Sequence, residues 1–271
     1  MLPVIGQGTW NMPESGAGRK EAQRAIARGV ELGMTHIDTA EMYGAGRVEE
    51  LVGEAIRPIA REKLFVATKV LPSNASYRET LAPAERSLRR LGTDYVDLYL
   101  LHWPGPHPLQ ETMRAFRRLI DDGKTRFAGV SNFEAGEMIE AASYLEGAPL
   151  ACNQVLYHLC ERTIEHELLP AAKRHGIAIV AYTPFGRGAF LRSARRRRIV
   201  ETIAEKHGAT VRQVALAFLT RDPAVFAIPK AGRVEHVEEN SGAAQLRLDP
   251  EDLAAIDAVF PPAAPGPLAT L

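Results

Sequence analysis

The sequence contains only two cysteines, Cys152 and Cys160, among its 271 residues. They cannot build the disulfide framework that holds many small secreted domains together. No histidine accompanies them at the spacing of a metal site, so we expect both to pack as small apolar side chains. The sequence therefore predicts a fold that is stabilised by its hydrophobic core and that contains no metal.

An excess of charge of either sign is also missing. Lysine and arginine number 33, as do aspartate and glutamate, and the pI is about 7.1. A balanced chain has no overall field to attract nucleic acid or anionic lipid, so we expect neither as a partner. No segment reaches the roughly 18 apolar residues of a membrane span, and "MLPVIGQGTW" has no basic region before a long apolar run. We expect a cytoplasmic monomer.

Short β-rich segments alternate with amphipathic segments of helical length along the chain, which is typical of parallel βαβ units. The predicted strands are 4–10, 35–40, 64–69, 96–102, 126–131, 151–155, 177–182 and 225–229. No proline-rich linker divides these eight units, so we predict an α/β fold with a single (β/α)8 TIM barrel over residues 1–260. The proline-rich tail 261–271 cannot sustain a helix and is expected to lie over the surface or to be mobile.

One segment has a biased composition: "RSARRRR", residues 192–198. The run precedes an amphipathic segment, so the simplest interpretation is the solvated first turns of a helix. It also follows the seventh predicted strand closely, and a phosphate contact therefore remains an alternative.

Polar side chains follow three neighbouring strands of the predicted barrel. The segment "HIDTAEMYG" places Asp38 at the end of the second strand and Tyr43 just beyond it, the third strand ends in Lys69, and the fourth ends in His102. Side chains alternate along a strand, so Lys69 and His102 are expected to point into the barrel mouth. Catalytic residues of such barrels come from these strand ends.

A buried lysine needs a partner, and Asp38 on the neighbouring strand can pair with Lys69. A lysine cation beside a phenol stabilises the phenolate, so we expect Lys69 to lower the pKa of Tyr43 and make it a usable acid near neutral pH. Each residue also has an ordinary structural explanation: Asp38 as a helix cap, Tyr43 as turn packing, Lys69 as an extended strand end and His102 as a core histidine. Because all four residues lie at neighbouring strand ends, we favour a joint catalytic role over these separate structural explanations.

These residues resemble the catalytic tetrad of the aldo-keto reductases. The segments "GQGTW", "HIDTAEMYG", "LFVATKV", "SLRRLGTDYVDLYLLHWP", "GKTRFAGVSNF", "NQVLYH", "AYTPFG" and "AIPKAGRVEHVEEN" occur in the order of that family and span nearly the whole chain. The resemblance is strongest to compact bacterial members that reduce small carbonyls such as methylglyoxal. It implies that Tyr43 donates the proton, Lys69 and Asp38 tune it, and His102 orients the carbonyl.

A nicotinamide enzyme can carry the Rossmann fingerprint, but "GQGTWN" has Asn11 where the last glycine of that pattern would stand. The family resemblance instead implies a carboxamide site of Ser131, Asn132 and Gln154, with Tyr182 stacked on the nicotinamide ring. Asn132 and Gln154 could alternatively cap loops. The remaining cofactor residues implied at this end are Thr9, Trp10, Asp38, Thr183, Phe185 and Gly186.

The adenine end departs from the family pattern. Relatives that use NADPH often have serine after the lysine of the eighth strand and an arginine further on, where this chain has Ala231 and His236. Arg233 and Lys230 could bind the 2′-phosphate instead, at the N-terminus of the next helix. Glu239 and Asn240 match residues that contact adenine. We therefore expect NADPH rather than NADH, although Arg233 could be only an exposed residue at a helix start.

The resemblance assigns the substrate wall to Trp10, Met42, Tyr43, His102 and Trp103, although the two tryptophans and Met42 could simply pack at the barrel rim. Short loops after His102 and after the last helix predict an open, shallow pocket for small aldehydes and ketones. Two rival functions remain. A regulatory subunit that binds nicotinamide nucleotide without turnover would not need a proton donor, and a metal-dependent barrel enzyme would need more carboxylates or histidines at its strand ends.

Overall fold

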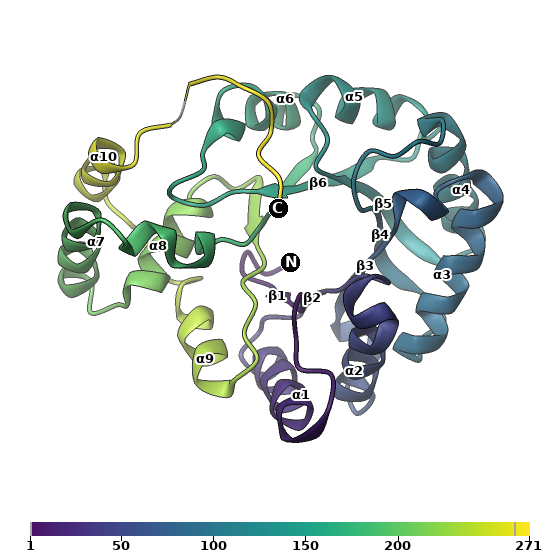
Figure 1. Ribbon diagram of the computed structural model, residues 1–271, viewed down its shortest axis with the longest axis horizontal. Helices are drawn as coiled ribbons and strands as arrows, with labels where there is room; N and C mark the ends of the chain where they lie inside the picture. The colour runs from purple at the N-terminus through teal and green to yellow at the C-terminus, as the bar shows by residue number, and fades with distance from the viewer. Residues whose placement is uncertain (1, 263) are drawn as a thin grey trace.

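The computed structural model describes residues 2–262 and 264–271, and in this part of the chain eight parallel strands form one sheet in the order β1 to β8. The strands are β1 Gln7–Gly8, β2 His36–Asp38, β3 Phe65–Val70, β4 Val96–Leu101, β5 Thr125–Ser131, β6 Leu150–Leu156, β7 Ala178–Tyr182 and β8 Val225–Ala227. Parallel bridges from Ile5 to Ala227 and from Gly8 to Lys230 join the first strand region to the last. The sheet therefore closes on itself (Figure 1).

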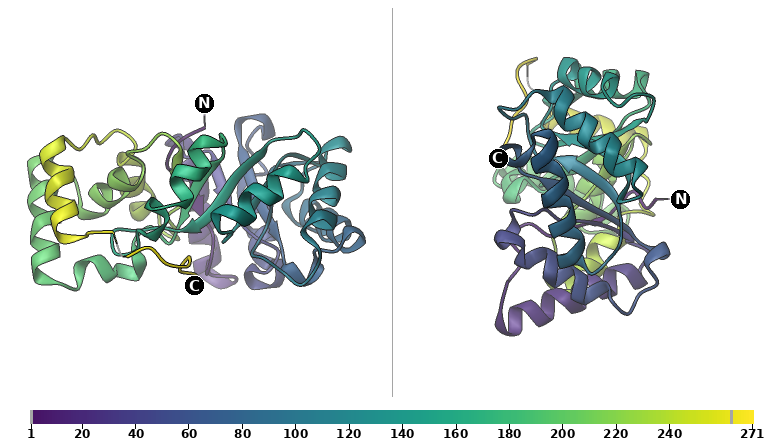
Figure 2. Two further views of the ribbon diagram at one scale, coloured as in Figure 1. Left: turned by 90° about the horizontal axis from the view of Figure 1, so that it is seen from above. Right: turned by 90° about the vertical axis from the view of Figure 1, so that its right-hand side faces the viewer.

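Helices surround this ring of strands, as Figures 1 and 2 show. They are α1 Gly16–Glu31, α2 Arg47–Ile56, α3 Tyr77–Leu91, α4 Leu109–Asp121, α5 Ala135–Ser143, α6 Leu168–Arg174, α7 Ala194–Lys206, α8 Val211–Leu219, α9 Val234–Gly242 and α10 Pro250–Val259. A helix follows each of the first seven strands, α8 leads into β8, and α9 and α10 follow β8. The predicted (β/α)8 barrel is confirmed.

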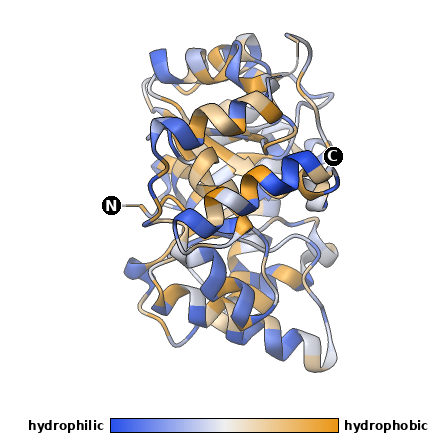
Figure 3. Cartoon of the chain, turned by 90° about the vertical axis from the view of Figure 1, so that its left-hand side faces the viewer, coloured by the Kyte–Doolittle hydropathy of each residue, from blue (hydrophilic) through white to orange (hydrophobic). Residues whose placement is uncertain are grey.

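The barrel has two apolar cores. The smaller one fills its interior with Ala67, Leu98, Leu100, Cys152, Val180 and Ile228. The larger one lies where the helices pack around the strands, and it includes the bulky side chains Ile37, Val66, Phe116 and Leu216. Figure 3 views the molecule from the side of α7 and α10 and shows that each of these helices carries both hydrophobic and hydrophilic residues. Cys152 packs as the small apolar side chain that the sequence predicted.

Glycines with positive φ angles end two of the helices. Gly176 and Gly208 have φ angles of +67° and +59° and follow α6 and α7 within two residues. The arginine run forms the first turns of α7, as the simplest interpretation held: Arg196 donates a hydrogen bond to the carbonyl of Val259 at 3.0 Å, and most of its neighbours in the run are exposed.

The first strand is much shorter than the predicted segment 4–10. A Cβ atom at Gly8 would lie only 2.6 Å from the carbonyl oxygen of Ile228, so the two backbones approach very closely where the barrel closes. Regular pairing with β2 covers only Gln7 and Gly8. The predicted segments 35–40, 177–182 and 225–229 likewise extend beyond β2, β7 and β8.

The tail does lie over the surface, and it crosses the carboxyl face of the barrel rather than an outer wall. Figure 2 shows the two ends of the chain on opposite faces of the molecule. The backbone N–H of Leu268 donates a hydrogen bond to Glu134 Oε1 at 2.7 Å, directly after β5. None of the helices in the described residues has the length and apolar composition of a membrane span.

Candidate active site

The side chain of Lys69 lies at the centre of the polar cluster that the sequence predicted. Its Nζ atom is 2.6 Å from Asp38 Oδ1, 2.8 Å from the carbonyl oxygen of Thr39 and 3.4 Å from Tyr43 Oη. The Lys69 side chain is completely buried, and that of Asp38 is 2% exposed. Three acceptors for three N–H donors satisfy the ammonium group without water.

Strand register and a tight turn bring these three residues together. Asp38 of β2 pairs with Ala67 of β3. Lys69 is two residues after Ala67, so its side chain points to the same inner face of the barrel. Tyr43 begins a short 3-10 turn, Tyr43–Gly46, in which Gly44 and Ala45 have φ angles of +56° and +53°. This left-handed turn directs the phenol back over the strand ends, which is a conformation that costs free energy for alanine.

The ion pair keeps Lys69 charged although it is buried. Burial by itself lowers the pKa of Lys69, but the neighbouring Asp38 carboxylate and Tyr43 hydroxyl act in the other direction, and the net pKa lies above its ordinary value. The site therefore holds a permanent cation 3.4 Å from the phenol oxygen.

The prediction that Tyr43 has a lowered pKa is wrong for this structure. Burial raises the pKa of Tyr43, and Asp38 adds to the rise, while Lys69 only partly offsets the two. The sequence could show the cation, but it could not show how completely the turn buries the phenol. Tyr43 is consequently protonated over the whole neutral range, which is the form that can donate a proton.

His102 approaches the same space from the end of β4. Its ring centroid lies 5.8 Å from that of Tyr43 and 4.9 Å from that of Trp103. Burial, with a contribution from the Lys69 cation, lowers the pKa of His102 to about 2. The imidazole is therefore neutral at physiological pH, and one of its nitrogens can donate a hydrogen bond to a carbonyl oxygen.

Asp38, Tyr43 and His102 border a cavity of about 250 Å³ at the barrel mouth. The buried Lys69 side chain lies just beneath this cavity. The five residues predicted to form the substrate wall all line the cavity: Trp10, Met42, Tyr43, His102 and Trp103. Trp10 is 45% exposed, Met42 40% and Trp103 38%. The mouth is therefore open to solvent, with large apolar side chains at its rim.

The predicted carboxamide residues form another wall of the cavity, together with the predicted stacking residue Tyr182. They are Ser131, Asn132 and Gln154. Gln154 Nε2 donates a hydrogen bond to Asp38 Oδ2 at 2.8 Å, and the Tyr182 hydroxyl donates one to Asn132 Oδ1 at 2.8 Å. Asn132 has a φ angle of +62°, which turns its side chain out of the strand direction. Amides and hydroxyls beside an aromatic ring fit a neutral nicotinamide carboxamide.

The remaining cofactor residues predicted at this end fall into two groups. Thr9 and Thr183 line the cavity, whereas Phe185 and Gly186 lie beyond it on the segment that follows β7. Thr183 has a φ angle of +51°, as does Arg187 just after this group. The Arg187 guanidinium lies 5.2 Å from the ring centroid of Trp10, so the segment after β7 reaches across to the segment after β1.

At the predicted adenine end only Lys230 lines the cavity. Arg233 occupies the N-cap position of α9 and is exposed, and its Nη2 atom lies 2.8 Å from His236 Nε2. Glu239 is paired with Arg212 at 3.0 Å. Asn240 is 2% exposed, and its Oδ1 atom has no hydrogen-bond partner within the described part of the chain. A cation at the N-terminus of α9, with an unpartnered amide oxygen further along the same helix, fits the phosphorylated end of a dinucleotide.

Sequence reasoning missed three residues of the cavity wall: Gly8, Ile228 and Leu271. Gly8 lies inside the quoted segment "GQGTW", so its place at a strand end was a usable signal. Leu271 had none, because its position depends on the path of the tail. Away from the cavity, the carboxylates of Asp249 and Asp252 lie close to His207, but the Lys206 ammonium already sits 2.6 Å and 2.8 Å from them.

Comparison with known proteins agrees with this geometry. The pattern described as the aldo/keto reductase family matches residues 4–260. The chain is 43% identical to the methylglyoxal reductase YeaE of Escherichia coli over 96% of this chain and 92% of that protein. It is 36% identical to the glyoxal reductase of Bacillus subtilis over 95% and 89%. A solved structure of an aldo/keto reductase from Klebsiella pneumoniae, in complex with NADP and acetate, superimposes with a TM-score of 0.91 at 41% identity and covers 100% of this chain and 96% of that one.

Proposed function

The chain belongs to the aldo-keto reductase family, and on that premise we propose that it reduces small aldehydes and ketones to alcohols with NADPH. The observation that carries the proposal is the buried Asp38–Lys69 ion pair beneath a protonated Tyr43 at the mouth of an open cavity. The neutral His102 lies at the same mouth. Together they provide a proton donor, a fixed cation and a hydrogen-bond donor for a carbonyl oxygen.

NADPH supplies a hydride to the carbonyl carbon when it is bound. Tyr43 donates its phenol proton to the carbonyl oxygen, which completes the alcohol. The phenolate left on Tyr43 faces the Lys69 ammonium, which favours the charged form and so assists the transfer. Asp38 holds that ammonium in place, and the neutral His102 imidazole orients the carbonyl by hydrogen bonding.

The residues that would hold the cofactor lie along one side of the cavity and beyond it. Ser131, Asn132 and Gln154 would bind the carboxamide, and the Tyr182 ring would stack on the nicotinamide. The segment from Thr183 to Gly186 would cover the diphosphate. At the other end, Lys230 and Arg233 would bind the 2′-phosphate, and His236, Glu239 and Asn240 follow them along α9.

For the substrate we propose small dicarbonyls of the methylglyoxal type. The name of the Escherichia coli relative is methylglyoxal reductase, and that of the Bacillus subtilis relative is glyoxal reductase. A cavity of about 250 Å³ with a rim of exposed Trp10, Met42 and Trp103 suits a compact, loosely held molecule. The alternative of a regulatory subunit without turnover is disfavoured, because a nucleotide sensor has no use for a buried cation beneath a protonated phenol.

We further propose that residues 1–260 form the reductase domain and that residues 261–271 are an appended tail. The family pattern ends at residue 260, and the last helix ends at Val259. The monomeric state and the cytoplasmic location that were expected from the sequence stay predictions.

The direct experiment is to follow NADPH oxidation by absorbance after methylglyoxal is added to the purified protein, with and without a metal chelator. We expect turnover that the chelator does not change. NADPH binding without any turnover over a panel of aldehydes would instead support the regulatory alternative, and loss of turnover with the chelator would support a metal enzyme.

A further inference from the structure

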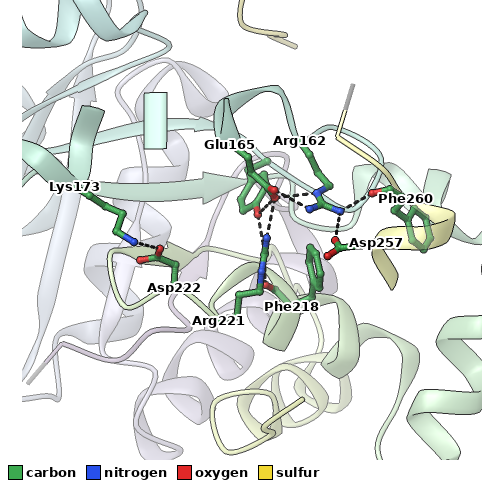
Figure 4. Close-up of polar contacts among 9 residues, drawn as sticks. Arg162, Glu165, Lys173, Phe218, Arg221, Asp222, Asp257 and Phe260 are labelled. Carbon is green, nitrogen blue, oxygen red and sulfur yellow. Dashed lines mark hydrogen bonds and ion pairs between the residues drawn. The ribbon is translucent and has the colours of Figure 1, made fainter. Parts of the chain in front are cut away.

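The tail begins at a firmly held point. Arg162 is 3% exposed, and its Nη1 atom donates hydrogen bonds to Asp257 Oδ1 at 2.7 Å and to the carbonyl oxygen of Phe260 at 2.5 Å. The same guanidinium forms a two-pronged ion pair with Glu165, which Arg221 also contacts (Figure 4). Bidentate arginine contacts of this kind fix geometry. The last turn of α10, and with it the start of the tail, is therefore anchored to the segment after β6.

The far part of the tail is held at a second point. Leu268 and Ala269 are half-buried, whereas residues 264–267 are exposed. Leu268 packs against the large apolar core, and its backbone N–H donates to Glu134 Oε1 at 2.7 Å. Three residues later Leu271 lines the cavity, as Tyr182 does. The tail thus spans from α10 to the rim of the cavity.

Glu134 has two tasks in this arrangement. It is the N-cap residue of α5, where its side chain and that of Glu137 form a capping box. Its Oε1 atom also receives the Leu268 N–H. Glutamate is not among the preferred N-cap residues, whereas the shorter aspartate is. The longer side chain is what reaches the tail.

We propose that Glu134 is a positioning residue which holds the tail at the cavity and thereby determines the size of carbonyl compound that the site selects. The inference rests on the proposed reductase activity. With the Leu268 hydrogen bond in place, Leu271 forms one wall of the cavity beside Tyr182. Without it, that wall is free to move away, so a compact substrate loses a contact surface and a bulkier one gains room.

Conservative substitutions separate the two tasks of Glu134. Glu134→Asp keeps a strong cap for α5 but is one methylene too short to reach Leu268. Glu134→Gln keeps both the length and an oxygen that can accept the Leu268 N–H. At the other partner, Leu268→Pro removes the donor, and Leu268→Ala is its matched control, because it loses the same apolar side chain and keeps the N–H.

The first measurement does not depend on catalysis. Hydrogen exchange is followed in the peptide that covers residues 264–271, in the full-length protein and without cofactor. We expect faster exchange in Glu134→Asp and no change in Glu134→Gln, with the same free energy of unfolding for all three proteins. Wild-type exchange in Glu134→Asp would overturn the proposed hydrogen bond as the anchor of the tail.

The second measurement is selectivity, expressed as kcat/KM for methylglyoxal divided by kcat/KM for a substituted benzaldehyde. We expect this ratio to fall by about tenfold in Glu134→Asp, mainly through KM, since the lost contact is worth about as much as one or two methylene groups. Leu268→Pro should produce the same fall, Leu268→Ala a smaller one, and Glu134→Asp combined with Leu268→Pro no more than either alone.

The outcomes keep the two proposals apart. If the wild type reduces neither carbonyl while exchange responds as expected, the reductase proposal fails and the tail anchor stands. If the wild type is active but the ratio is unchanged in Glu134→Asp, or the two substitutions add in full, then Glu134 is only a helix cap and the inference is wrong.

Discussion

Lys69 and Asp38 form an ion pair of 2.6 Å from which solvent is excluded, and the second oxygen of the same carboxylate receives the amide of Gln154 at 2.8 Å. The pair therefore joins the proton donor to the wall that would hold the nicotinamide. A buried pair of this kind is sensitive to loss of one partner, because the remaining charge has no water to solvate it.

We expect Lys69→Met to lower the free energy of unfolding by about 3–5 kcal/mol, since it leaves the Asp38 carboxylate buried without its cation. Urea denaturation measures this change. The control is Asp38→Asn combined with Lys69→Met, which removes both charges and should recover much of the lost stability while remaining inactive. Equal destabilisation of the single and double variants would show that packing, and not the unpaired charge, is responsible.

Tyr43→Phe tests the proton donor. We expect turnover to fall by about 10²-fold or more, because a general acid is removed, while the Kd for NADPH stays within about threefold of the wild type. Steady-state kinetics and fluorescence titration give the two quantities. Reduction of aldehydes at a near wild-type kcat would exclude Tyr43 as the donor.

Arg233→Ala tests the cofactor preference. Arg233 is exposed and contacts His236 at the start of α9, where a guanidinium would interact with a 2′-phosphate but not with the hydroxyl that NADH carries there. We expect the Kd for NADPH to rise by about tenfold or more and that for NADH to change by less than about threefold. Arg233→Lys, which keeps the charge, should be intermediate.

Fluorescence titration with both cofactors distinguishes the outcomes. Equal losses for NADPH and NADH would mean that Arg233 only starts the helix, and tighter binding of NADH by the wild type would overturn the cofactor assignment.

A fourth prediction concerns pH. Burial lowers the pKa of His36 from 6.5 to about 4 in the folded protein. Between these two values the unfolded chain binds a proton that the folded chain does not, so the free energy of unfolding falls as the pH decreases from about 6.5 to about 4. Both ring nitrogens of His36 lack hydrogen-bond partners in the described residues, so His36→Leu removes no bond.

We expect His36→Leu to reduce the slope of unfolding free energy against pH by about one proton within this window. Urea denaturation at several pH values gives the slope. An unchanged slope would mean that His36 is already protonated in the folded state or that it has a partner that keeps its pKa near 6.5.

Residues whose placement depends on local rules were predictable from the sequence. The alternation of side chains on β3 and the strand order were enough to place Lys69 beside Asp38, and the position of His102 after β4 followed from the same reasoning. Ser131, at the end of β5, was placed at the site only by the family resemblance. The net direction of the Tyr43 pKa was not predictable, because it depends on how far a left-handed turn buries the phenol. A sequence pattern can predict which side chains lie next to an ionisable group, but it does not predict how deeply that group is buried.

The place of Leu271 was beyond sequence reasoning for a different reason. It follows from two contacts that join distant parts of the chain, Arg162 with Phe260 and Glu134 with Leu268. Neither glutamate nor arginine at these positions has a local signature that points to a partner about 100 residues away or more. Extended segments without periodicity take their positions from such single contacts.

The small number of cysteines has a consequence for the chemical durability of the enzyme. Burial raises the pKa of Cys152 to about 12 inside the barrel, and burial also raises that of Cys160. Only the thiolate is a strong nucleophile, so both sulfurs stay in their unreactive form at neutral pH. A protein that handles electrophilic carbonyls thereby offers them almost no thiolate to modify.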